Sequence, residues 1–164
     1  MKSLKDIKIF SLPENVGDAV PERDIEALAV IEAACFSSPW KESSFRDSLK
    51  NSNTVWRFFL IRYGDTPVGY GGVYSVIDEA FITNIAVMPE FRRKGIASVI
   101  LESIISYCRK SDIKRIMLEV RVSNEGAVSL YRKFGFAVDG ISKNHYSAPS
   151  EDAFLMSLTI SDTL

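Results

Sequence analysis

Three consecutive segments with strand character, joined by very short connections, constrain the fold of this chain more than any other feature. Residues 55–63, 68–77 and 81–87 are rich in aromatic and β-branched side chains. The turn sequence GDTP at 64–67 makes the first connection, and Asp-Glu at 78–79 makes the second. Connections this short predict an antiparallel meander, because parallel neighbours need a crossover of about a dozen residues or more.

The pattern is helical on both sides of this meander. Residues 25–36 carry apolar side chains at helical spacing, interrupted by Glu32, and residues 40–49 continue as a second helix after a break. Residues 96–108 are apolar over a wide arc, which is typical of a helix packed deeply against a sheet. The remaining predicted elements are a strand at 7–12, a polar loop at 13–23, a strand at 114–122, a helix at 125–134 that ends at Gly135, and strands at 136–141 and 153–160.

This order of elements predicts one α/β domain that covers residues 1–164. A mixed, mostly antiparallel sheet of about seven strands, with helices on both faces, accommodates the order βααβββαβαββ. The sequence has no internal repeat and no linker long enough to divide it into domains.

The composition is that of an ordinary globular protein, with 46% hydrophobic and 25% charged residues. A net charge of -1 gives no bias toward nucleic acid or an anionic membrane, so neither is expected as a partner. The N-terminus lacks the apolar run of a signal peptide, and no stretch reaches the roughly 18 apolar residues of a membrane span. Cys35 and Cys108 lack the spacing of a metal site or a disulfide framework. We therefore expect a cytoplasmic protein with reduced thiols and no metal centre.

A basic turn lies between the meander and the long apolar helix. Arg92, Arg93 and Lys94 precede Gly95 at the predicted helix start, where the helix dipole makes each cation unfavourable by up to about 1 kcal/mol unless an anion is bound. Open amides at a helix start, with a glycine that allows close approach, form a phosphate site. The alternative is a solvated basic turn. The P-loop and the Rossmann glycine pattern are both absent from the sequence.

The pattern Arg92-x-x-Gly95-x-Ala97, placed after the segment NIAV at 84–87, resembles the pyrophosphate-binding motif of the GNAT superfamily of acetyltransferases. The resemblance implies acetyl-CoA as the co-substrate. It also implies that amides of residues 93–98 hold the pyrophosphate, and that the strand around 85–87 pairs with the pantetheine arm. The implied cofactor-binding residues are Ile85, Ala86, Val87, Arg92, Arg93, Lys94, Gly95, Ile96, Ala97, Ser98 and Asn124.

Further stretches of the sequence resemble one subgroup of this superfamily. FSSPW at 36–40, LEVRVSN at 118–124 and the segment 127–136 resemble the bacterial ribosomal-protein alanine N-acetyltransferases and their archaeal and eukaryotic N-terminal acetyltransferase relatives. The resemblance spans roughly residues 25–156 and implies direct acetyl transfer, in a ternary complex, to a protein N-terminus. The implied partner is the alanine-initiated end of a small-subunit ribosomal protein. A GNAT enzyme for a small amine, such as a polyamine or an antibiotic, and an acyl-CoA-binding module without turnover remain as alternatives.

Two residues in these stretches are candidates for catalysis. Glu119 alternates with apolar neighbours on its predicted strand, and a solvated strand face is the ordinary interpretation of such a glutamate. Helices on both faces predict partial burial instead, which favours a proton-accepting role. The resemblance implies that Glu119 is the general base, acting through a water. It implies that the Tyr131 hydroxyl protonates the departing thiolate, although the spacing of Tyr131 also suits a core residue.

Four other residues complete the candidate site. Asn124 is expected to cap the following helix, to contact CoA, or both. Trp40, His145 and Tyr146 are expected to contact the acceptor, with the segment 143–146 in a substrate-facing loop. His145 is the only histidine, and relatives commonly have tyrosine there, so it bears on substrate preference more than on chemistry. Neither cysteine lies in these motifs, so no covalent nucleophile is expected.

Overall fold

One mixed sheet forms the centre of the molecule in the computed structural model, which describes residues 4–51 and 54–161. Within these residues the sheet has seven strands in the order β1-β2-β3-β4-β5-β7-β6. The pairing of β4 with β5 is parallel and the other pairings are antiparallel. The strands are β1 (Ile7–Leu12), β2 (Val55–Tyr63), β3 (Thr66–Val76), β4 (Glu79–Val87), β5 (Arg115–Arg121), β6 (Ala137–Ser147) and β7 (Ser150–Thr159).

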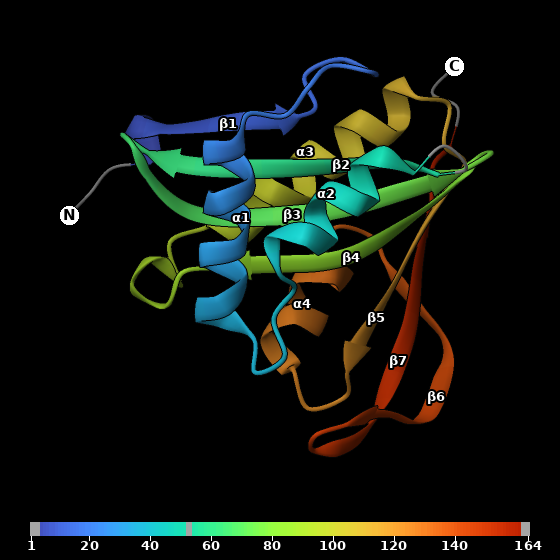
Figure 1. Ribbon diagram of the computed structural model, residues 1–164. Helices are drawn as coiled ribbons and strands as arrows, with labels where there is room; N and C mark the ends of the chain where they lie inside the picture. Colours follow the sequence, from blue (N-terminus) through green and yellow to red (C-terminus); the bar gives the residue numbers. More distant parts are fainter. Residues whose placement is uncertain (1–3, 52–53, 162–164) are drawn as a thin grey trace.

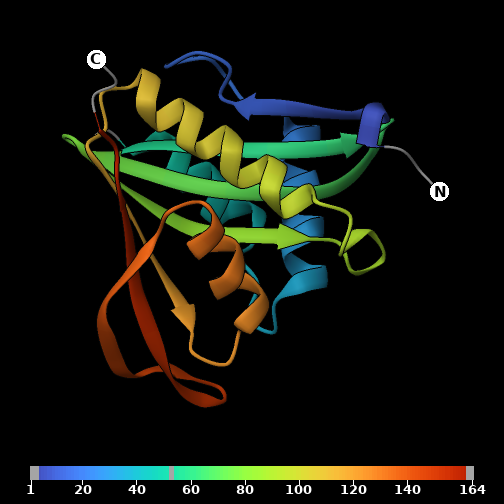
Figure 2. The same cartoon turned by 180° about the vertical axis from the view of Figure 1, so that it is seen from behind.

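Four helices cover both faces of the sheet in this part of the chain, as the sequence predicts. Figure 1 shows α1 (Glu22–Cys35) and α2 (Glu42–Lys50) on one face. Figure 2 shows α3 (Ile96–Lys110) and α4 (Glu125–Lys133) on the other. The predicted fold class, the meander β2–β3–β4 and the order of elements are confirmed.

Two hydrophobic cores lie on the two faces of the sheet. The first lies beneath α3 and α4 and includes Ile100, Ile104 and Leu118. The second lies beneath α1 and α2 and includes Leu28 and Phe45. The central strands therefore carry apolar side chains on both faces, which explains why β2 and β3 read as nearly continuous apolar runs.

Glycines on β3 allow α3 to lie directly on the sheet. A Cβ atom on Gly71 would stand 3.0 Å from the Cδ1 atom of Ile104 and would overlap the Cγ2 atom of Ile100. A Cβ atom on Gly69 would stand 3.2 Å from the Cγ2 atom of Ile96, the first residue of α3. The close contact fixes the position of the helix start relative to β3 and β4.

The hairpin β6–β7 is longer than the sequence pattern predicts. Residues 143–146 were expected in a loop, but they belong to β6, and β7 begins at Ser150. The register between β6 and β7 shifts between Ser142 and Tyr146, and Asn144 has a φ of 50°. This bulge breaks the alternation of side chains, so the strand pattern ends early in the sequence. In the part of the chain that the structure describes, no helix is both long and apolar enough to cross a membrane.

Candidate active site

The strands β4 and β5 part in the middle of the sheet. Their pairing covers Glu79 to Phe81 on β4 and Arg115 to Met117 on β5, after which β4 continues to Val87 and β5 to Arg121. Figure 1 shows the two strands diverging beyond this short ladder. The opening between them exposes main-chain groups that a bound ligand in extended conformation could pair with.

A bulge in β4 shapes one wall of this opening. Gly72 of β3 pairs with Asn84 and Val73 pairs with Ile82, so Thr83 is an extra residue on β4. A bulge increases the local twist and redirects the following residues. The predicted cofactor-binding residues Ile85, Ala86 and Val87 follow it directly and form the end of β4.

The basic turn and the start of α3 lie just beyond the end of β4. Gly95 is the N-cap of α3 with a φ of 81°, and it provides no side-chain cap. The first turn of α3 contains no acidic residue. The first hydrogen bond of the helix runs from the amide of Val99 to the carbonyl of Gly95, so the amides of the predicted residues 96–98 precede it. A free helix start next to exposed cations fits an anionic pyrophosphate group.

The three cations of this turn have different positions. The Nε of Arg92 donates to the carbonyl of Val87 at 2.9 Å, and the Nζ of Lys94 donates to the carbonyl of Glu90 at 2.9 Å. Arg93 has a φ of 62°. Arg92 therefore ties the turn to the end of β4, one of the two strands that border the opening.

Glu119 lies on β5, two residues beyond its pairing with β4. Its neighbours Leu118 and Val120 point into the core beneath α3 and α4, so Glu119 points to the opposite face. The expected partial burial is wrong, because the side chain is 51% exposed. Its face is open because α1 packs on β3 and β4 and α2 packs on β2, which leaves β5 uncovered.

His145 contacts the predicted base directly. Its Nε2 atom lies 2.7 Å from Oε2 of Glu119, and its Nδ1 atom lies 3.4 Å from Oγ of Ser142. The ring of Tyr146 packs edge-on against the imidazole at a centroid distance of 4.8 Å. The hairpin β6–β7 thus brings two predicted substrate-contacting residues to Glu119.

Tyr131 lies on α4 and is buried. Burial, and to a smaller extent the nearby Tyr146, raises the pKa of Tyr131 to about 12. Burial followed by the Glu119 carboxylate also raises the pKa of Tyr146. Glu119, Tyr131, His145 and Tyr146 therefore form one electrostatic neighbourhood, in which both phenols keep their protons at neutral pH.

Asn124 and Trp40 have structural contacts that the sequence predicted only in part. Oδ1 of Asn124 accepts a hydrogen bond from the amide of Ala127 at 3.2 Å, so the predicted helix cap is confirmed. The ring of Trp40 contacts the rings of Phe45 and Trp56, at centroid distances of 5.5 and 5.7 Å. These ring contacts do not include Glu119, Tyr131, His145 or Tyr146.

A buried carboxylate that the sequence patterns did not identify supports the segment around Trp40. Glu32 of α1 is 2% exposed, and its Oε1 atom accepts the amide of Trp40 at 3.2 Å. It also accepts a short hydrogen bond from the hydroxyl of Tyr70 and bonds from Nδ2 of Asn84 at 3.3 Å. Glu32 therefore links the α1–α2 connection to β3 and to the bulged part of β4. In the sequence, Glu32 could have been noticed because it is the single charged residue on the apolar face of a predicted helix.

Both cysteines are free thiols. Burial raises the pKa of Cys108 to about 12. Burial also raises the pKa of Cys35, whose Sγ donates to the carbonyl of Val87 at 3.3 Å. Thiols held in the protonated form are poor nucleophiles, which agrees with the predicted direct transfer.

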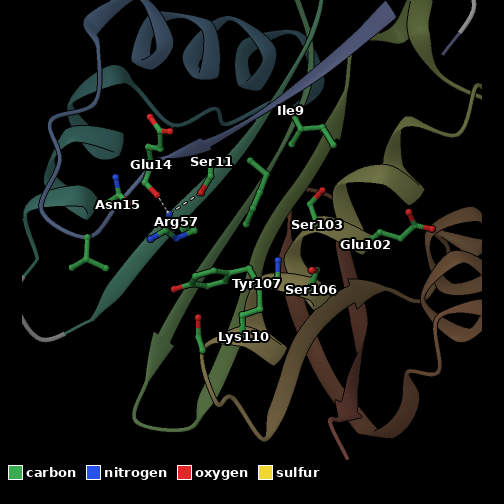
Figure 3. A pocket seen from close by; sticks show the side chains of 13 residues that line it. Ile9, Ser11, Glu14, Asn15, Arg57, Glu102, Ser103, Ser106, Tyr107 and Lys110 are labelled. Carbon is green, nitrogen blue, oxygen red and sulfur yellow. Dashed lines mark hydrogen bonds between the residues drawn. The ribbon is translucent and has the colours of Figure 1, made fainter. Parts of the chain in front are cut away.

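A cavity of about 810 Å³ lies at the far end of α3 from the basic turn. Figure 3 shows Arg57, Ser11, Glu14 and Tyr107 around it. Arg57 is buried, and its Nη1 donates to Oγ of Ser11 at 2.7 Å and to the carbonyls of Pro13 and Glu14. Arg57 thereby fastens the polar loop after β1 to β2, which gives that loop a structural role away from the opening.

An opening between two parallel strands, followed by an uncapped basic helix start, fits the acyl-CoA site that the sequence resemblance implies. The model of the acetyltransferase (GNAT) family matches residues 25–136, and the chain belongs to the GNAT family of acetyltransferases. It is therefore an enzyme whose acetyl donor is acetyl-CoA, as the sequence motifs implied.

Relatives cover nearly the whole chain. A ribosomal protein bS18-alanine N-acetyltransferase of Escherichia coli K12 is 32% identical over 149 residues, which are 90% of this chain and 99% of the relative. A Bacillus subtilis protein that is provisionally named for the same activity is 40% identical over 139 residues, which are 85% of this chain and 91% of the relative. The crystal structure of the Escherichia coli ribosomal-protein-S18-alanine N-acetyltransferase matches with a TM-score of 0.80 and 30% identity, covering 96% of each chain.

Proposed function

We propose that this enzyme acetylates the N-terminal α-amine of a protein, and that its substrate is the alanine-initiated end of a small-subunit ribosomal protein in the cytoplasm. The parting of β4 from β5, with Glu119 on one wall, is the observation that carries the proposal. The Escherichia coli relative named for this reaction supports the choice of acceptor, because the similarity extends over 90% of this chain.

The donor would lie along β4 and end at the basic turn. The amides that begin α3 would hold the pyrophosphate, together with the cations of residues 92–94. The main chain of residues 85–87 would pair with the pantetheine arm in the manner of an added strand. This arrangement brings the thioester toward the narrow end of the opening, between the bulge of β4 and Glu119.

The chemistry requires a neutral amine and a stabilised leaving group. The nitrogen–carbon bond forms as the carbon–sulfur bond breaks, and the amine proton passes to Glu119, directly or through a water. A peptide α-amine is roughly a tenth neutral at pH 7, whereas a lysine side chain is roughly 0.04% neutral. An exposed carboxylate is thus a sufficient base for an α-amine.

Tyr131 would donate a hydrogen bond to the departing sulfur. Because its pKa is about 12, its hydroxyl carries a proton over the whole physiological range. Complete transfer to a thiolate whose conjugate acid has a pKa of about 8.5 would be uphill by roughly 5 kcal/mol. The favoured role of Tyr131 is therefore stabilisation of the thiolate, which takes its final proton from solvent.

The acceptor would approach from the face of the sheet that carries Glu119. His145 and Tyr146 on the hairpin would border it on one side, and the connection that contains Trp40 would border it on the other. An extended peptide end can be held by its main chain, so that selectivity depends on the room for the first side chain. A small first residue such as alanine suits this arrangement.

Competition among acceptors tests the proposal. The acceptors are an Ala-starting peptide, its Leu-starting and N-blocked analogues, and spermidine, each with acetyl-CoA. The Ala-starting peptide should have the highest kcat/KM by at least tenfold, or about 1.4 kcal/mol in transition-state binding. Preference for spermidine, or equal reaction of the N-blocked peptide through a lysine, would assign the enzyme to a different acceptor class.

A further inference from the structure

The contact between His145 and Glu119 orients both side chains. An ionised carboxylate can only accept hydrogen bonds, so the Nε2 atom at 2.7 Å from Oε2 carries a proton. In the neutral imidazole, Nδ1 then accepts from the hydroxyl of Ser142 at 3.4 Å. The imidazole holds one carboxylate oxygen and leaves the other, Oε1, for the proton of an acceptor amine.

The other charged side chains around the imidazole pair with one another. Arg121 of β5 lies 3.2 Å from Glu151 of β7, and Lys143 of β6 lies 3.1 Å from Asp152 of β7. Among the charged residues that the structure describes on these three strands, Glu119 is the one in direct contact with His145. The charge of the imidazole therefore acts mainly on Glu119.

The aromatic neighbour of His145 restrains its ring. Tyr146 packs edge-on against the imidazole, and the guanidinium of Arg121 lies 4.1 Å from the centre of the Tyr146 ring. The amide of Asn144 donates to Oδ1 of Asp152 at 2.8 Å and holds the bulge. The side chain of His145 is 30% exposed, so it is both held in place and accessible to protons from solvent.

We propose that His145 is a positioning residue for Glu119 and sets the lower end of the pH range in which Glu119 accepts a proton from the acceptor. The proposal depends on the role of Glu119 as the base. A neutral imidazole orients the carboxylate. A protonated imidazole places a positive charge beside it and weakens it as a base. Histidine is the side chain that most commonly serves as a pH-dependent switch in proteins.

Variants can separate the hydrogen bond from the titration. His145→Gln keeps an N–H donor for the carboxylate but does not titrate, whereas His145→Leu removes both properties. Initial rates would be measured with an Ala-starting peptide at saturating acetyl-CoA between about pH 5.5 and 8.5. The amine itself titrates equally in every variant, so the ratio of kcat between His145→Gln and the wild type isolates the imidazole.

That ratio should be constant above about pH 7.5 and should rise three- to tenfold as the pH falls to about 5.5. His145→Leu should lower kcat at the upper end of this pH range, where the neutral imidazole orients the carboxylate, with little change in peptide KM or in Tm. A flat ratio in a folded His145→Gln variant would overturn the proposal. A change confined to KM would also overturn it and would make His145 a substrate-contacting residue.

A second measurement does not depend on turnover. Because His145 is the only histidine, the proton NMR signals of its ring report its titration directly in the untagged protein. Removing the carboxylate charge with Glu119→Gln should lower the titration midpoint, and an unchanged midpoint would overturn the coupling. If the midpoint moves but Glu119→Gln retains full turnover, the coupling exists but Glu119 is not the base, and both the catalytic role of His145 and the base assignment fail.

Discussion

Replacing Gly71 by alanine should separate the sheet from α3. The new methyl group would overlap Cγ2 of Ile100 and stand 3.0 Å from Cδ1 of Ile104, whereas carbon atoms prefer separations of about 3.5–4.0 Å. Overpacking of this kind costs about 1–3 kcal/mol, and replacing a strand glycine returns about 0.5–1 kcal/mol. The net loss should be about 1–2 kcal/mol, or a fall in Tm of roughly 2–8 °C for a protein of this size. Acetyl-CoA affinity should also fall, because the same helix presents the pyrophosphate-binding amides.

Thermal unfolding with and without acetyl-CoA measures both effects, and a double-mutant cycle identifies their cause. Ile100→Leu removes the γ2 methyl while conserving volume, so it should be less costly in the Gly71→Ala background than in the wild type. Gly140→Ala is the matched control, since Gly140 also lies on a strand and a Cβ there meets nothing within 4 Å. A Gly71→Ala variant as stable as the wild type, or additive effects in the cycle, would refute the idea that α3 is held on β3 through this glycine.

Two further substitutions test the donor side of the site. Gly95→Val forces a β-branched residue into a φ of 81° and should abolish the Tm increase that CoA produces, whereas Gly64→Val, at a φ of 58° in a distant turn, should preserve it. Tyr131→Phe keeps the ring and should lower kcat by a similar factor at pH 6 and pH 9, because the hydroxyl, with its pKa of about 12, is protonated at both. A loss of activity that only parallels a loss of Tm would make Tyr131 a core residue alone.

The fold could be predicted from patterns among neighbouring residues in the sequence. Short connections required the meander from β2 to β4, and the change of period at Gly95 marked the start of α3. The basic turn could be recognised because its residues are contiguous and their charges conflict with the helix dipole. Features encoded within a few neighbouring residues could thus be predicted from the sequence alone.

Features that depend on distant residues could not be predicted in this way. Glu119 was expected to be partly buried because helices were predicted on both faces, and nothing in the sequence indicates that α1 and α2 leave β5 uncovered. The contact between Glu119 and His145 joins β5 to β6 across a hairpin whose bulge obscures the strand pattern. Glu32 was visible as an interruption of an apolar face, but its partners Tyr70 and Asn84 lie 38 and 52 residues further along the chain.

The short seam between β4 and β5 also bears on how the molecule unfolds. The sheet consists of an antiparallel half from β1 to β4 and another from β5 to β7, joined in the main chain by three residue pairs. Acetyl-CoA bound in the gap would contact both halves of the sheet. Its binding energy would therefore stabilise the association of the two halves more than it stabilises either half alone. Binding of the donor would then determine how cooperatively the protein unfolds. The enzyme with bound donor would unfold as one unit, whereas the empty enzyme would exchange the amide hydrogens of its central strands through partial unfolding.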